Sequence, residues 1–202
     1  MFTNNWFDDY HVAVFLQAKT LGHTPRCLEI GSYEGRSSVW ISENMAGSHG
    51  SLTCVDTWDG SAEHSDKDKC NLYERFLANT TSQRSAGQIR PLRGKSIDVL
   101  SKLVSEHTQY DLVYIDGSHI MKDVLADALL AYHMLAENGI LIFDDYTWGD
   151  GIAPYQRPQA AIDAFLLSIT GTFTLLCSKH TETQRGLVVY SCSVSSLNDL
   201  FC

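Results

Sequence analysis

Short apolar runs alternate with longer amphipathic stretches along most of this chain. The runs that have the length of buried strands end at a glycine or an aspartate, and they comprise residues 26–30, 52–55, 112–115 and 140–143. Between them, apolar residues recur every three or four positions, as they do on the buried face of a helix. This alternation predicts an α/β fold with a parallel sheet and helices on both faces.

The helical spacing covers residues 6–21, 36–46, 71–86, 96–105, 120–137 and 158–169. Asn138 and Gly139 fit the end of the helix over 120–137. Residues 57–70 are polar and charged, which predicts a long loop. Three more strands are expected in residues 89–94, 172–178 and 185–192, and the last two should pair as a hairpin because no helix separates them. The pattern therefore predicts a doubly wound, mostly parallel seven-stranded sheet with a C-terminal antiparallel hairpin.

Length and composition suit one globular domain over residues 1–202, with 44% hydrophobic and 19% charged residues. Fifteen basic and 24 acidic residues give a net charge of −9, which repels phosphate backbones and makes nucleic acid a disfavoured partner. No apolar run approaches the roughly 18 residues of a membrane span, so no membrane association is expected. The N-terminal residues lack a basic region and do not resemble a signal peptide.

The chain has six cysteines, and none belongs to a C-x-x-C pair. Cys27, Cys54, Cys177 and Cys192 lie in or beside the apolar, strand-like runs. We interpret them as buried free thiols in a reducing compartment, which predicts a cytoplasmic protein.

Acidic residues follow three of the predicted strands. Asp56 ends one strand, Asp116 ends another, and Asp144 and Asp145 stand together after the run 140–143. In doubly wound sheets the carboxyl ends of the strands border the ligand site. Adjacent carboxylates repel and are costly to desolvate unless a positive group compensates them. The four acids therefore predict a site at this edge of the sheet.

The stretch LEIGSYEGRS, residues 28–37, follows a predicted strand and precedes a predicted helix. Gly31 allows a tight turn, and Gly35 allows the helix start to approach a ligand closely. Asp56 lies 25 residues beyond Gly31, a distance that suits an acid bound to a ribose diol. The alternative is a plain strand–helix turn. The spacing differs from the G-x-G-x-x-G of pyrophosphate-binding turns.

The first of these motifs resembles motif I of the class I S-adenosylmethionine-dependent methyltransferases. The stretches CLEIGSYEGRSSVWI, LTCVDTWDG and YDLVYIDGSHIMKDVLADALLAYHMLAENGILIFDDY follow the order of that family over nearly the whole chain. VDTWDG, IDGSH and FDDY further resemble the cation-dependent small-molecule O-methyltransferases, of the sugar or natural-product type and of the catechol type. The resemblance implies a Rossmann-like fold and S-adenosylmethionine as cofactor.

The resemblance also implies roles for individual residues. Glu29, Gly31 and Gly35 would border the cofactor, and Ser32 and Tyr33 would line its site. Ser37 would hold the methionine carboxylate, Asp56 the ribose hydroxyls, and Ser96 would lie near the adenine. Trp58 packs on the adenosine, lines the acceptor pocket, or belongs to the core.

By the same resemblance, Asp116, Asp144 and Asp145 are ligands of a divalent cation. Oxygen ligands favour a hard cation such as Mg²⁺, Mn²⁺ or Ca²⁺. Such an ion would gather two oxygens of the acceptor and lower the pKa of the attacking hydroxyl. In the catechol type the third ligand is an amide, whereas Asp145 is a carboxylate. The alternative is that the acids cap loops or helix N-termini, and it applies best to Asp145.

His119 lies three residues after Asp116, where the catechol type has a lysine base. It is our candidate general base, with a metal ligand, a partner of an aspartate, or a structural role as alternatives. Segment 57–75, with Asp59 and His64, is a lid over the acceptor or a solvated loop. Tyr146 and Trp148 line the acceptor pocket or pack in the core.

The leading hypothesis is a metal-assisted methyl transfer to a hydroxyl of a small molecule, such as a sugar or a catechol-like diol. The alternatives are a metal-free transfer with His119 as the base, and a cofactor-binding module without catalysis. A nicotinamide-dependent oxidoreductase fits less well, because the glycine spacing differs. The acceptor and the choice of metal stay open, and so does a homo-oligomeric state.

Overall fold

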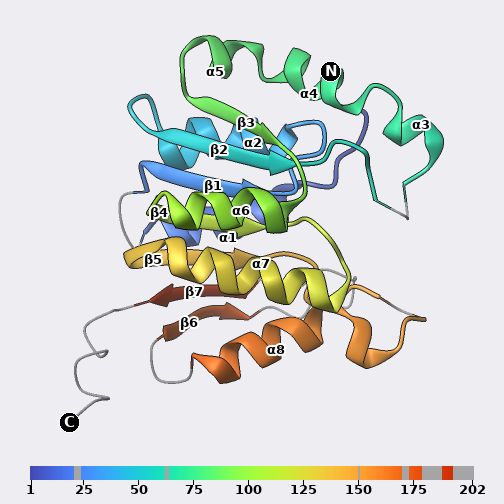
Figure 1. Ribbon diagram of the computed structural model, residues 1–202. Coiled ribbons are helices and arrows are strands. Elements are labelled where there is room, and N and C mark those ends of the chain that lie inside the picture. The colour runs from blue at the N-terminus through green and yellow to red at the C-terminus, as the bar shows by residue number, and fades with distance from the viewer. Residues whose placement is uncertain (21–23, 62–63, 150, 170–172, 179–187, 193–202) are drawn as a thin grey trace.

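The computed structural model describes residues 1–20, 24–61, 64–149, 151–169, 173–178 and 188–192. Its strands form one sheet in the order β3-β2-β1-β4-β5-β7-β6 (Figure 1). Five of them are parallel: β1 (Arg26–Ile30), β2 (Ser51–Asp56), β3 (Ile89–Arg93), β4 (Tyr110–Ile115) and β5 (Leu135–Phe143). The expected α/β fold with a parallel, doubly wound sheet is confirmed.

Two further strands extend the sheet beyond β5. The strand β7 (Val188–Cys192) runs antiparallel to β5, and β6 (Phe173–Ser178) runs antiparallel to β7. The loop that we expect to join them lies outside the described residues. Because the strand order reverses between β1 and β4, the crevice for a ligand is expected at the carboxyl ends of these two strands.

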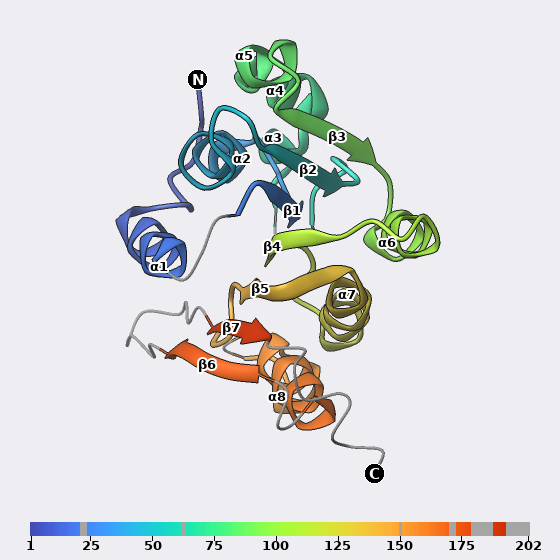
Figure 2. The same ribbon diagram turned by 90° about the vertical axis from the view of Figure 1, so that its left-hand side faces the viewer.

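Helices cover both faces of the sheet (Figure 2). One face carries α1 (Asp9–Lys19), α2 (Arg36–Ile41) with its π-helical continuation Ser42–Ala46, and α4 (Leu72–Asn79). The other carries α6 (Ser96–Ser105), α7 (Met121–Met134) and α8 (Pro158–Ser168). The short helices are α3 (Asp66–Lys69), α5 (Thr81–Ser85) and the 3₁₀ turn η2 (Pro154–Gln156).

The sheet separates two hydrophobic clusters. Phe15, Ile41 and Phe76 anchor the helices of the first face, and Val124 and Phe165 anchor those of the second; all five are buried. The strands β1, β2 and β4 are buried on both faces, which explains their continuous apolar runs.

Cysteine burial is described for three positions. Cys27 and Cys54 are buried free thiols, as predicted, whereas Cys70 is exposed and also free. Burial raises the pKa of the Cys54 thiol well above its usual range, which keeps it protonated and unreactive. Within the described residues, the helices are too short or too polar to cross a membrane.

Several boundaries differ from the sequence prediction. The expected loop over 57–70 contains α3, whose N-cap Ser65 accepts a hydrogen bond from the Asp68 amide. The helix expected over 71–86 is divided at Thr80 into α4 and α5. The long helix α7 stops at Met134, so Asn138 and Gly139 lie inside β5 instead of ending a helix. Strand pairing of Leu135 with Tyr110 outweighs the helical periodicity there.

Candidate active site

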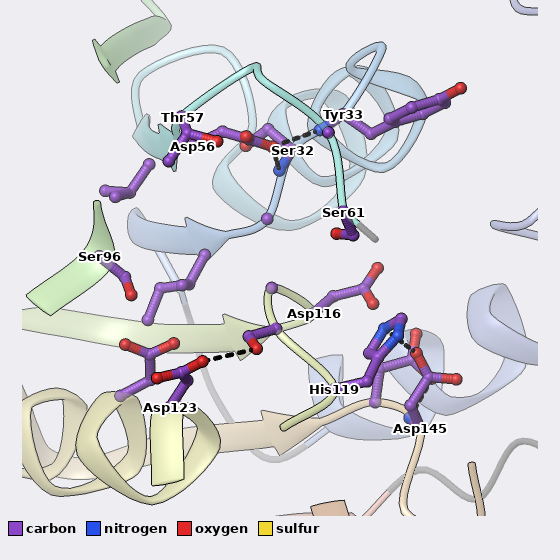
Figure 3. Close-up of a pocket in the computed structure, with 18 of the residues that line it drawn as sticks. Ser32, Tyr33, Asp56, Thr57, Ser61, Ser96, Asp116, His119, Asp123 and Asp145 are labelled. Carbon is purple, nitrogen blue, oxygen red and sulfur yellow. Dashed lines mark hydrogen bonds and ion pairs between the residues drawn. The ribbon is translucent and has the colours of Figure 1, made fainter. Parts of the chain in front are cut away.

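A cavity of about 1010 Å³ opens at the carboxyl ends of the parallel strands. Its wall includes most of the residues that the sequence singled out: Gly31, Ser32, Tyr33, Ser37, Asp56, Ser96, Asp116, His119, Asp144 and Asp145. Figure 3 shows two groups of labelled residues that face each other. Ser32, Tyr33 and Asp56 lie along one side of the cavity, and His119 and Asp145 lie across from them. The cavity is large enough for a cofactor and a small acceptor together.

The glycine turn is held by Asp56. One carboxylate oxygen of Asp56 accepts hydrogen bonds from the backbone N–H groups of Ser32 and Tyr33, both at 2.8 Å, and the other accepts one from Trp58 at 2.7 Å. Gly31 has a φ of 89°, and a Cβ there would lie 1.9 Å from the carbonyl oxygen of Asp116. The turn therefore needs glycine at this position, because only glycine lets the two loops touch.

Three predicted cofactor residues support the turn from beneath and do not line the cavity. Glu29 is fully buried, and its carboxylate accepts hydrogen bonds from the hydroxyls of Ser32, Ser37 and Ser38. Burial raises the pKa of Glu29, and these hydroxyls counteract that effect. Gly35 has a φ of 83° and packs against α4, not against the cavity.

Trp58 is the third such residue and belongs to the core. Its ring packs against Tyr73 and Phe76, with centroids 4.8 and 4.6 Å away, and its indole N–H donates to the carbonyl of Tyr33 at 2.9 Å. Of the three roles that the sequence left open, the structure assigns the core role.

Two of the three predicted metal ligands meet, together with His119. Asp116, His119 and Asp145 each offer one ligand atom, and these atoms lie within 4.8 Å of one another. His119 Nε2 is 2.8 Å from Asp145 Oδ2. Asp145 has a φ of 56°, a strained backbone for a non-glycine residue, which turns its side chain back toward His119. Two carboxylates and an imidazole form a donor set that suits a divalent cation.

The third predicted ligand, Asp144, is occupied by protein groups. His11 Nε2 lies 3.1 Å from Asp144 Oδ2, and the Tyr114 hydroxyl donates to the same oxygen. The Asp145 amide donates to Asp144 Oδ1 at 2.7 Å. Burial alone would raise the pKa of Asp144, but His11 and Tyr114 more than offset it and lower the pKa. Asp144 thus differs from the expected ligand, because α1 brings the His11 imidazole to it.

His11 is itself clamped between two carboxylates. Its Nδ1 is 2.8 Å from Asp8, the N-cap of α1, and its side chain is 1% exposed. Burial would lower the pKa of His11, but the hydrogen bonds and charges of Asp144 and Asp8 raise it. The Tyr114 hydroxyl also reaches Asp116 at 3.2 Å. A continuous polar chain therefore connects α1 to the acid cluster.

The remaining predicted residues divide between the cavity and the surface. Trp148 lines the cavity and packs on His119, with ring centroids 4.6 Å apart. His64 also lines it and stacks on Trp6 at 5.2 Å. Tyr146 does not line it and donates to Asp163 on α8 at 2.8 Å. Asp59 is exposed and forms an ion pair with Arg93.

Sequence reasoning missed four contributors to this site: His11, Tyr114, Trp6 and Asp127. His11 and Trp6 belong to an N-terminal segment whose position beside the cavity no local pattern reveals. Asp127 is a buried carboxylate on α7 that lines the cavity wall. The only signal for it was an acidic residue among the apolar positions of an amphipathic helix.

Comparisons with known proteins agree with this fold. The chain is similar to the O-methyltransferase of Bacillus cereus, solved with S-adenosylhomocysteine, with a TM-score of 0.69 and 17% identity over 94% of this chain and 84% of that one. The chain is also similar to TomG of Streptomyces achromogenes, an O-methyltransferase of tomaymycin synthesis solved with S-adenosylmethionine. The TM-score is 0.64, and the identity is 16% over 91% of this chain and 77% of TomG.

A protein of Clostridium thermocellum proposed to be an rRNA methylase gives a TM-score of 0.66, with 12% identity over 96% of this chain and 98% of that one. The fold alone therefore does not define the acceptor. The uncharacterized protein y4gI of Sinorhizobium fredii is 29% identical over 142 residues, which are 68% of this chain and 15% of y4gI. The chain thus spans a small part of the curated relative that it matches.

A match to a protein-family model assigns the chain to a family. The model of a methyltransferase domain matches residues 28–146, more than half of the chain. This range runs from the glycine turn to the residues just beyond Asp145, and so contains both groups of cavity residues. The chain belongs to the methyltransferase-domain family.

Proposed function

We propose that this chain is an S-adenosylmethionine-dependent O-methyltransferase that methylates a hydroxyl of a small molecule with the help of a divalent cation. The observation that carries the proposal is the cavity itself. It joins the glycine turn and Asp56 on one side to the cluster of Asp116, His119 and Asp145 on the other. The similar folds solved with S-adenosylmethionine or S-adenosylhomocysteine support the cofactor.

In this proposal the cofactor lies along the glycine turn. The backbone of Gly31, Ser32 and Tyr33 faces its methionine part, and Asp56 accepts a ribose hydroxyl. A carboxylate has about four acceptor sites, and Asp56 uses three of them on backbone amides. Glu29 and Gly35 act indirectly, since they fix the turn. Ser37 donates to Glu29 and keeps acceptor capacity for the methionine ammonium or for water.

Asp116, His119 and Asp145 would hold the cation, which would bind acceptor oxygens and lower the pKa of the attacking hydroxyl. Mn²⁺ fits this mixed set of carboxylates and imidazole at least as well as Mg²⁺. The acceptor oxygen forms a bond to the methyl carbon while the carbon–sulfur bond breaks. The products are a methyl ether and S-adenosylhomocysteine, and the hydroxyl proton leaves to a base or to water.

The acceptor would lie between the acid cluster and the aromatic side of the cavity. Trp6, His64 and Trp148 line the cavity, with Trp148 beside His119, and such rings suit the flat face of a sugar or a catechol. Vicinal oxygens fit a chelating cation. Described residues of segment 57–75 also line the cavity, which supports a role for that segment in covering the acceptor.

A second candidate is the same transfer without a metal. The contact of His119 with Asp145 favours it, because a carboxylate 2.8 Å from one nitrogen of a neutral imidazole can orient the ring as a general base. In that case His119 takes the hydroxyl proton, and Asp145 stabilises the resulting imidazolium.

Calorimetric titration separates these candidates. Wild-type protein is titrated with S-adenosylhomocysteine and then with Mn²⁺ or Mg²⁺, in parallel with Asp145→Ala and, as a matched control, Asp144→Asn. We expect Asp145→Ala to bind the nucleoside and lose the cation, whereas Asp144→Asn keeps both. Activity on diol and catechol acceptors should then disappear on addition of a chelator. Activity that survives the chelator would favour the metal-free candidate, and failure to bind S-adenosylhomocysteine would overturn the proposal.

A further inference from the structure

One buried carboxylate on the cavity wall has no role in the proposed methyl transfer. Asp127 lies on α7, lines the cavity and is 1% exposed. Neither of its oxygens has a hydrogen-bond partner of normal geometry among the described residues. Ser96 and Asp123, its neighbours on α6 and α7, lie across the cavity from His119 and Asp145 in Figure 3. Asp127 therefore belongs to a distinct part of the wall.

A buried carboxylate without a partner is costly, because water no longer solvates its charge. Burial raises the pKa of Asp127 to about 6, and the charge of Asp123 adds to this effect, while the Ser96 hydroxyl opposes it. Such a group changes readily between an acceptor and a donor near neutral pH. Buried groups with such perturbed pKa values are commonly found at functional sites, where they contact a ligand.

The surroundings of Asp127 favour a flat ring as that ligand. Ile30, Val55 and Ala126 line the cavity from β1, β2 and α7. Gly117 lies beside the carboxylate, since a Cβ built on it would be 3.8 Å from Asp127 Oδ2. Apolar wall residues beside a buried carboxylate are suited to a heteroaromatic ring that carries a hydrogen-bonding edge.

We propose that Asp127 recognises the adenine of the cofactor by accepting a hydrogen bond from its exocyclic 6-amino group. This inference rests on the proposed function, which places the ribose at Asp56 and the sulfonium toward His119, and so directs the base toward α6 and α7. In its protonated form the same carboxyl group can also donate to the neighbouring ring nitrogen N1. Asp127 is then a specificity residue for the cofactor and has no part in the chemical step.

Asp123 provides a matched control on the same helix. It lies one turn before Asp127, is half-buried, and already accepts a hydrogen bond from the Ser118 hydroxyl at 3.0 Å. The Asp123 carboxylate thus has a hydrogen-bond partner within the protein, and its removal should not change recognition of the adenine.

The experiment compares two ligands on four proteins. S-adenosylhomocysteine and its analogue with purine in place of adenine, which lacks only the 6-amino group, are titrated calorimetrically into the wild type, Asp127→Leu, Asp127→Asn and Asp123→Asn. We expect the wild type to prefer the amino compound by about 10-fold or more, because loss of the amine leaves a buried acceptor unpaired. Asp127→Leu should bind both compounds equally. Asp127→Asn should retain a preference, because its amide offers both an acceptor and a donor, and Asp123→Asn should match the wild type.

Equal binding of the two compounds by the wild type would overturn the inference, and so would a preference that persists in Asp127→Leu. Circular dichroism confirms that each variant is folded. If the wild type binds neither compound, the proposed function fails together with the inference. If it binds both equally, only the role of Asp127 fails, so the two failures are distinguishable.

Discussion

Asp144 and Asp127 are both buried aspartates on the wall of one cavity, yet the protein treats them in opposite ways. Asp144 contacts His11, Tyr114 and the Asp145 amide, and its pKa is lowered. Asp127 has no hydrogen-bond partner of normal geometry in the described part of the chain, and its pKa is raised to about 6. The fold supplies partners to one carboxylate, whereas we infer that the other contacts the cofactor.

The difference shows how burial alone misleads. Both residues are nearly inaccessible, but only the partners indicate whether a carboxylate stabilises the fold or is reserved for binding. Asp144 connects α1 to the acid cluster and contributes to the structure of the site. A buried, unpaired Asp127 costs stability, and its inferred contact with the adenine supplies the reason for that cost.

The largest change in the free energy of unfolding should come from removing the histidine partner of Asp144, which makes Asp144 more like Asp127. His11→Ala removes the imidazole and leaves Asp144 buried without its histidine partner. We expect the free energy of unfolding to fall by about 3 kcal/mol, as measured by urea denaturation at neutral pH. His133→Ala is the control, since His133 is exposed on α7 and its loss should cost no more than about 0.5 kcal/mol. Equal stabilities of the two variants would show that the His11–Asp144 contact contributes nothing.

Removing the charge of Asp127 should raise the free energy of unfolding, whereas removing His11 should lower it. Asp127→Asn should stabilise the ligand-free protein by about 2 kcal/mol at pH 8, because the folded wild type must bury a charge that the unfolded chain exposes to water. The folded pKa of about 6 lies above the unfolded value of about 3.9, so the penalty is complete above pH 6. It should shrink as the pH falls and vanish near pH 4. Thermal or urea unfolding from pH 4 to 8 measures this gain, and a gain that does not depend on pH would refute the electrostatic explanation.

A double-mutant cycle sharpens the first comparison. With His11 present, Asp144→Asn loses the ion pair, whereas in the His11→Ala background the same change removes an unpaired charge. We expect a coupling energy between the two positions of about 1–2 kcal/mol, obtained from urea unfolding of the four proteins. Additive effects would mean that His11 and Asp144 act independently.

The smallest effect is expected at Asp123. Its carboxylate is half-buried and bonded to Ser118, so Asp123→Asn should change the unfolding free energy by no more than about 0.5 kcal/mol. A stabilisation as large as that of Asp127→Asn would show that any acid removed from α7 has the same effect, and the contrast with Asp127 would be lost.

The sequence predicted the features that depend on local periodicity. The buried runs located the parallel strands, and the aspartates after them identified the edge where the site lies. The end of α7 was misplaced, because Leu135 continues the helical pattern while its pairing with Tyr110 makes it strand. Trp58 illustrates the same limit, since no pattern distinguishes a ring in the core from one in the pocket.

The sequence predicted those site residues that lie near the ends of strands. Asp116, Asp145 and His119 came together because β4 and β5 are neighbours. The role of Asp144 could not be predicted, because its partner His11 lies on α1, 133 positions earlier in the sequence. No local pattern reveals a contact between residues so far apart in the chain. Asp127 was missed because an acid on an amphipathic helix is usually exposed.

A crystal structure of the protein with S-adenosylhomocysteine and Mn²⁺ tests the proposed function most directly. We expect the homocysteine along the Gly31 turn, the ribose at Asp56 and the 6-amino group within hydrogen-bond distance of Asp127. We also expect the metal on Asp116, His119 and Asp145, with Asp144 still bound to His11. A nucleoside in the reverse orientation, or a metal bound by Asp144 with His11 displaced, would contradict this proposal.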